Sequence, residues 1–76
     1  MRDPNFESEI TAMSKRELAM LYALDLTPRS AVNRLMLWIN HNPALVAALQ
    51  ATGYRKTAKI FSPIQVKLIY TYLGEP

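Results

Sequence analysis

The side chains that could take part in catalysis are few, and most of them occupy positions at which they would cap a helix. Ser14 and Ser62 each precede a Glu or Gln by three residues, which is the spacing of a capping box. Ser30 and His41 remain, but eleven positions on one helix would separate them by roughly 16 Å. The sequence has no phosphate-cradling glycine loop and no paired carboxylates on a rigid element. We therefore expect no enzymatic activity.

Composition also disfavours metal ions and membranes. The 76 residues include no Cys and one His, which leaves no thiolate ligand and no second imidazole for a zinc site. The longest apolar run, residues 18–24, is far too short to cross a membrane. The first residues do not have the pattern of a secretory signal. We expect a cytoplasmic protein that binds no metal and no cofactor.

Positive charge is concentrated in the later part of the chain. Residues 1–25 contain three Lys or Arg and five acids, whereas residues 26–76 contain six Lys or Arg and the single acid Glu75. The overall charge of +3 is the sum of −2 over residues 1–25 and +5 over residues 26–76. A one-signed surface attracts phosphates and releases counterions on binding, which makes double-stranded DNA the expected partner. On charge alone, a merely solvated basic face explains the pattern equally well.

Candidates for reading DNA bases lie early in the second predicted helix. Arg29 and Asn33 are four residues apart and point the same way, with Arg34 beside them. Arg recognises guanine and Asn recognises adenine by bidentate contacts in the major groove. The start of a recognition helix is where such side chains are presented. The later cations are the candidates for phosphate contacts: Arg55, Lys56, Lys59 and Lys67.

Helix caps define the elements that must position these side chains. The capping box at Ser14 predicts a helix from about Lys15 to about Leu24. A cap residue followed by Pro predicts three more helices, over about 28–41, 43–52 and 63–73, the last two ending at glycines. Residues 54–61 hold β-formers without a helix cap, and predict an extended segment, a short hairpin or a loop. We expect residues 1–12 to form a flexible arm and residues 13–76 a single helical domain.

Apolar residues divide into core stripes and a surplus. On the second helix, Ala31, Leu35, Trp38 and Ile39 form the expected inward stripe. Half of the chain is apolar, which is a large share for so small a domain. The alternative function is therefore a helical interaction or homo-oligomeric assembly module without a nucleic-acid role, although a homodimer would also suit a DNA-binding protein. Apolar residues outside the stripes are the candidates for the partner surface: Met20, Leu37, Ile64 and Leu68.

The order of these elements over residues 14–74 resembles the excisionase and MerR-type winged-helix class. Glu17-Leu18-Ala19 stands in the first helix, residues 30–35 in the recognition helix, residues 55–61 in the wing, and Ser62 before the closing helix. The resemblance implies a mainly α, winged-helix-like helix-turn-helix domain, with three to four helices and a short extended wing-like segment. It also implies DNA binding.

The whole chain is also similar to a family of short bacterial proteins of unknown function from gut anaerobes and their mobile elements. The matching segments are Glu17-Leu18-Ala19, Trp38-Ile39, residues 53–56 and residues 73–76. This resemblance carries no activity. It implies a small bacterial protein and, as a setting, a regulator or architectural factor of a phage or mobile element.

Overall fold

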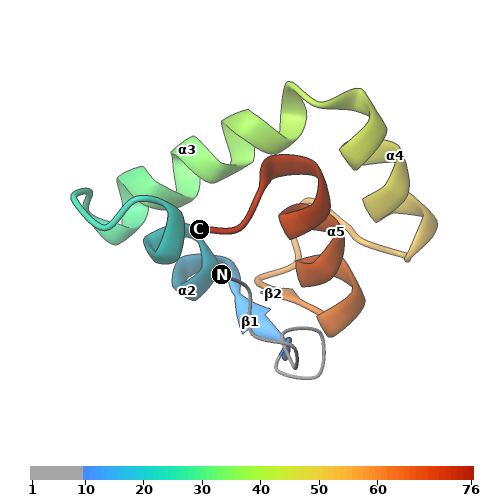
Figure 1. Ribbon diagram of the computed structural model, residues 1–76, viewed down its shortest axis with the longest axis horizontal. Helices are drawn as coiled ribbons and strands as arrows, with labels where there is room; N and C mark the ends of the chain where they lie inside the picture. The colour runs from blue at the N-terminus through green and yellow to red at the C-terminus, as the bar shows by residue number, and fades with distance from the viewer. Residues whose placement is uncertain (1–9) are drawn as a thin grey trace.

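The computed structural model describes residues 10–76. This part of the chain contains four helices and two very short strands (Figure 1). The helices are α2 (Lys15–Tyr22), α3 (Pro28–Asn40), α4 (Pro43–Ala51) and α5 (Pro63–Leu73). The strands are β1 (Met13–Ser14) and β2 (Ile60–Phe61). In Figure 1, α3 runs along one side of the molecule, α2 and α4 lie at its two ends, and α5 lies between them. The arrangement is mainly helical and winged-helix-like, as the sequence predicts.

Each helix begins at the cap that the sequence predicts. The four cap side chains accept a hydrogen bond from the backbone N–H three residues later, at 3.0–3.4 Å. Both capping boxes are complete, since Glu17 and Gln65 also accept the backbone N–H of their cap residues. These bonds satisfy N–H groups that have no partner within a helix, and so fix where the helix starts. The caps are Ser14, Thr27, Asn42 and Ser62.

The helix ends agree less closely with the sequence. α4 and α5 stop just before Gly53 and Gly74, whose φ angles of +87° and +90° suit glycine. α2 ends at Tyr22, two residues earlier than predicted, because the backbone leaves the helix at Ala23 (φ −140°, ψ 70°). Ala23 is buried, and its carbonyl accepts the N–H of Leu26 at 3.2 Å. This turn reverses the chain and brings α3 back against α2.

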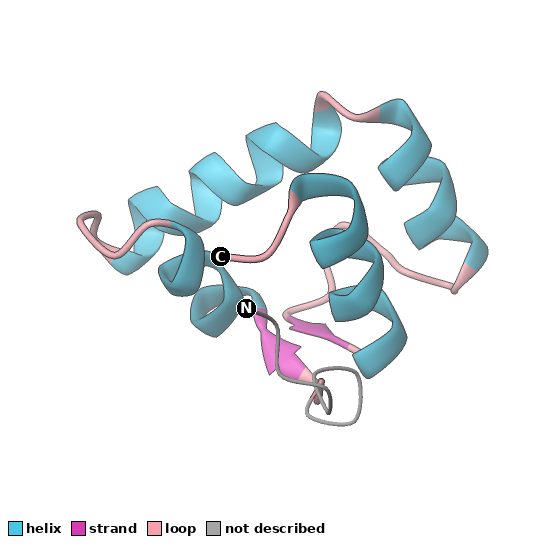
Figure 2. Cartoon of the chain, in the orientation of Figure 1, coloured by secondary structure: helices cyan, strands magenta, loops and turns pink. Residues whose placement is uncertain are grey.

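Only the last two residues of the segment 54–61 form a strand (Figure 2). The preceding residues form turns, in which Ala58 donates its N–H to the carbonyl of Arg55 at 2.9 Å. The strand pairs antiparallel with β1, with Met13 opposite Phe61 and Ser14 opposite Ile60. The prediction of a local hairpin within residues 54–61, which was one of the alternatives, is therefore wrong. The segment has no Gly, Asn or Asp to form a tight turn, so its strand pairs with the start of the domain instead.

The predicted arm lies mostly outside the described residues, which begin at residue 10. Ile10 is half-buried and packs against the core, and residues 10–12 have no regular structure. The domain therefore begins within the last residues of the predicted arm.

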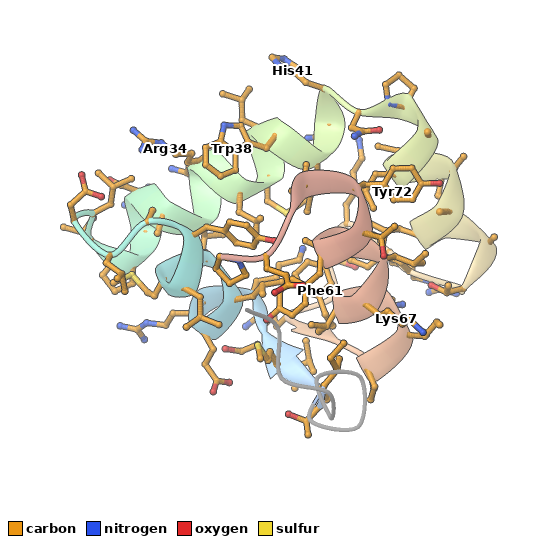
Figure 3. All side chains as sticks on the ribbon, viewed as in Figure 1. Arg34, Trp38, His41, Phe61, Lys67 and Tyr72 are labelled. Carbon is orange, nitrogen blue, oxygen red and sulfur yellow. The ribbon has the colours of Figure 1, made fainter. Side chains whose placement is uncertain are left out.

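The core gathers around Phe61, which lies centrally in Figure 3 and is fully buried. The inward stripe of α3 is confirmed at Ala31, Leu35 and Ile39, which are each 1% exposed. Trp38 differs from the prediction, because 39% of its surface is exposed. Its ring packs edge-on against Tyr22, with centroids 6.1 Å apart, and so covers the rim of the core rather than filling it.

Tyr22 joins the last turn of α2 to the C-terminal segment. Its hydroxyl donates a hydrogen bond to the carbonyl of Gly74. Burial raises the pKa of Tyr22 above its usual value of 10, and the nearby Tyr70 and Glu75 raise it further. The pKa of Tyr70 is raised as well, by burial first and then by Glu75.

We expect alkaline pH to destabilise the fold through these phenols. Above about pH 10 the unfolded chain loses phenolic protons that the folded chain keeps, so stability is intact below that pH and falls as pH rises further. Urea unfolding between pH 8 and pH 11 measures the decline. Tyr22→Phe should make it shallower, whereas Tyr72→Phe, which removes an exposed hydroxyl on α5, should not. An equal effect of both substitutions would contradict the assignment to Tyr22.

Candidate nucleic-acid interface

Two of the predicted base-reading residues meet at a shallow depression between α2 and α3. Arg29 and Asn33 line it from α3, and Arg16 lines it from the first turn of α2. Val32 forms part of the apolar floor, and the volume is about 370 Å³. Arg29 and Asn33 are both exposed and one helical turn apart, so their polar ends are presented side by side.

A second depression, of about 340 Å³, adjoins the first. Arg16 and Val32 line both depressions, and the second also includes Lys15 and Lys59. The two shallow depressions share these lining residues, and three separate parts of the chain contribute to the region that they form. Among the described residues, no acid lines either depression. We call this region the basic surface: Lys15, Arg16, Arg29, Asn33 and Lys59.

The short sheet explains why Lys15 and Lys59 are neighbours. β1 leads directly into α2, and antiparallel pairing places the residue after β1 beside the residue before β2. The backbone N–H of Lys15 donates to the carbonyl of Lys59 at 2.9 Å. Two residues that are far apart in the chain thus belong to one surface.

Lys15 also holds the segment that carries the later cations. Its ammonium donates a hydrogen bond to the carbonyl of Lys56 at 2.7 Å. The same nitrogen lies 5.2 Å from the ring centroid of Tyr54 and 5.9 Å from that of Phe61. These rings are stacked at 5.5 Å, and a cation near aromatic faces is held by electrostatic attraction. Lys15 therefore positions this segment, while Arg16, Arg29 and Lys59 present exposed charges.

Helix ends add to the positive potential of the basic surface. Lys15 and Arg16 are the first residues of α2, and Arg29 is the second residue of α3. Each helix N-terminus carries about half a positive charge, so cations there raise the potential at some cost to the helix. The acid of the first turn of α2, Glu17, is engaged by the backbone N–H of Ser14 at 3.1 Å. Because the carboxylate of Glu17 offsets the half charge at the start of α2, the N-terminus of α3, which has no acid in its first turn, is the one that favours a bound anion such as phosphate.

Arg34 does not join Arg29 and Asn33. It follows Asn33 directly, and adjacent residues on a helix point about 100° apart. Figure 3 shows Arg34 extending outward from α3, on the side that also carries Trp38 and His41. The three predicted base-reading residues therefore occupy two sides of the helix.

The predicted phosphate contacts are also divided. Lys59 lies in the basic surface, whereas Lys67 is exposed on α5 beside Ile64, at a different depression. Arg55 and Lys56 line a third depression, between α3, α4 and the segment that follows Gly53. Only one of these four candidates thus lines the basic surface itself.

The apolar partner candidates differ in exposure. Leu37 and Ile64 are 53% and 54% exposed, on α3 and at the start of α5. Met20 and Leu68 are half-buried and pack against the core. Two of the four candidates for the partner surface are therefore well exposed.

Lys15 and Arg16 were missed as site residues by sequence reasoning. Dividing the charge along the chain placed them in the acidic first part, away from the six later cations. Their positions directly after a helix cap were the available signal, because such residues are exposed at a helix N-terminus. Knowledge of the β1–β2 pairing was needed to place them beside Lys59.

Neither a metal-binding cluster nor a membrane-spanning helix is found among the described residues. Residues 10–76 contain no group of three His, Asp or Glu side chains that could hold a metal ion. No helix in this part of the chain is long and apolar enough to cross a membrane.

Comparison with known proteins identifies a family without an assigned activity. No curated protein and no solved structure matches the chain. The predicted relation to excisionase and MerR-type proteins stays a prediction, as does an origin in gut anaerobes. The other predicted resemblance, to a family of short proteins of unknown function, is confirmed. The model of the family described as a domain of unknown function (DUF4248) matches residues 9–76, and the chain belongs to this family.

Proposed function

We propose that the protein binds double-stranded DNA through the basic surface. The observation that supports this proposal is the convergence of Arg16, Arg29 and Lys59, from three chain segments, on two adjoining depressions that no acid lines among residues 10–76. Their charges and the N-terminus of α3 attract the phosphate backbone together. Lys15 keeps the segment before β2 in place and adds to the same potential.

Arg29 and Asn33 supply sequence preference in this proposal. They lie near the start of α3, and each can make a bidentate contact to a base edge in the major groove. The flanking Arg16 and Lys59 contact phosphates, which fix the orientation of α3 without reading sequence. As a setting, the resemblances favour a cytoplasmic regulator or architectural factor of a phage or mobile element.

The salt dependence of binding tests the proposal. Fluorescence anisotropy with a random-sequence duplex is measured at 50 mM and 200 mM salt. The two phosphate contacts, by Arg16 and Lys59, predict a slope of about −1.8 in a plot of log affinity against log salt, which is a loss of about 12-fold over this range. The absence of binding at 50 mM salt would overturn the proposal.

A second candidate function is association with a protein partner or a second copy of the chain. The large apolar side chains that α3 leaves exposed, Leu37 at 53% and Trp38 at 39%, favour it, because exposed apolar surface often marks an interface. Light scattering over a range of protein concentrations tests self-association. A monomer at all concentrations excludes the homodimer, whereas a dimer that Leu37→Ser dissociates supports it.

A further inference from the structure

A depression of about 290 Å³ lies between the C-terminal half of α3, α4 and the segment that follows Gly53. It is more enclosed than the two depressions of the basic surface. Its floor is apolar: Ile39 and Leu49 are each 1% exposed, and Val46 and Tyr54 are half-buried. The volume is close to the lower limit for small-molecule pockets, which suits one aromatic ring or a short branched acyl chain.

Contacts around Tyr54 show that this wall of the depression is preformed. The ring is stacked on the fully buried Phe61, with an interplanar angle of 23°. Its hydroxyl lies 3.9 Å from the sulfur of Met36, and the ammonium of Lys15 lies 5.2 Å from the ring centroid. A wall held from several sides needs little reordering when a ligand binds, which favours affinity.

The rim of the depression is positively charged. Arg55 and Lys56 line it and are exposed, and the backbone of Lys56 is fixed by the hydrogen bond from Lys15. Asn40 and Gln50 add amide groups, and no acid lines this depression within the described residues. The nearby end of α3 carries about half a negative charge, which is smaller than the two full charges of the rim. The net local charge therefore favours an anion.

We propose that this depression binds a small organic carboxylate with an apolar body. The body lies against Ile39, Leu49 and Tyr54, and the carboxylate interacts with Arg55 and Lys56. The fork of the Arg side chain matches a carboxylate in two parallel hydrogen bonds, and the ammonium of Lys56 adds a point charge. Binding of such a ligand does not depend on the DNA proposal and is measured without DNA.

A matched pair of probes tests the charge requirement. The full chain, labelled with ¹⁵N, is titrated with phenylacetate and separately with phenylacetamide, which has the same ring but no charge. Phenylacetate should shift the amide signals of Tyr54, Arg55 and Lys56 and those of the floor residues. Phenylacetamide should bind about tenfold more weakly, because it cannot form a charge-assisted contact. Equal binding of both probes would overturn the proposal, as would shifts confined to the basic surface.

Two variants locate the site. Arg55→Gln removes an exposed charge without touching the core, and should weaken phenylacetate binding about tenfold. Lys67→Gln removes a charge on α5, away from the depression, and should leave the affinity unchanged. If both variants weaken binding equally, the anion is held by the overall charge of the protein and the site is wrong. Val46→Phe, which fills the depression but keeps its rim charges, should abolish binding in a chain that still gives a folded spectrum.

Discussion

Replacing Phe61 with Ala is expected to remove about half of the free energy of unfolding of the protein. Truncating a fully buried Phe costs about 3–5 kcal/mol through lost burial and the cavity that remains. A domain of this size has a total stability of only about 4–11 kcal/mol. Phe61 also stacks on Tyr54 and lies opposite Met13 in the sheet, so its loss weakens both contacts. Urea unfolding followed by circular dichroism measures the effect.

The neighbouring residue of the same strand supplies the control. Ile60 is 62% exposed, and Ile60→Ala should cost no more than about 1 kcal/mol. Phe61→Leu, which keeps most of the apolar volume, should recover part of the loss. A loss from Ile60→Ala as large as that from Phe61→Ala would mean that strand propensity, rather than burial of Phe61, stabilises this region.

The double variant Arg16→Ala with Lys59→Ala is expected to lose about 100-fold in affinity for duplex DNA at 50 mM salt. Each neutralised phosphate contributes about tenfold at that concentration, because its counterion is released into a dilute salt solution. Both side chains are exposed, so their removal should leave the fold intact. The salt slope should fall in magnitude from about −1.8 to about zero. Anisotropy titrations at several salt concentrations give both quantities.

Charge removal elsewhere is the matched control. Arg34→Ala with Lys67→Ala lowers the net charge by the same amount, but these residues lie outside the basic surface. We expect no more than about a threefold loss, since distant charges are partly screened. If this pair weakens binding as much as the Arg16 and Lys59 pair does, DNA contacts the protein without a defined surface.

The helices could be predicted from the sequence because their signals are local. Ser14, Thr27, Asn42 and Ser62 each bond an N–H three residues away, so the starts of all four helices follow from short segments. The early end of α2 could not be predicted in this way. Ala23 leaves the helix because the chain must turn to pack α3 on α2, which is a tertiary requirement.

The candidate site was predictable only within one helix. The spacing of Arg29 and Asn33 correctly placed them side by side, since residues four apart on a helix are neighbours. Arg34 was grouped with them although helical geometry points it elsewhere, and Lys67 was grouped by charge alone. Lys15 and Arg16 were missed because they join Lys59 through the pairing of β1 with β2. Such pairing between distant segments has no short sequence signal.

The pairing of β1 with β2 also sets an order for folding during synthesis. α2 and α3 leave the ribosome together and can pack at once, but Phe61, which fills the centre of the core, follows much later. At about 5–20 residues per second, several seconds pass between the appearance of β1 and that of β2. During this interval the core to which Leu18, Leu35 and Phe61 all belong is incomplete, so apolar surface is exposed. The nascent domain is therefore most prone to aggregation, and most in need of a chaperone, just before β2 emerges.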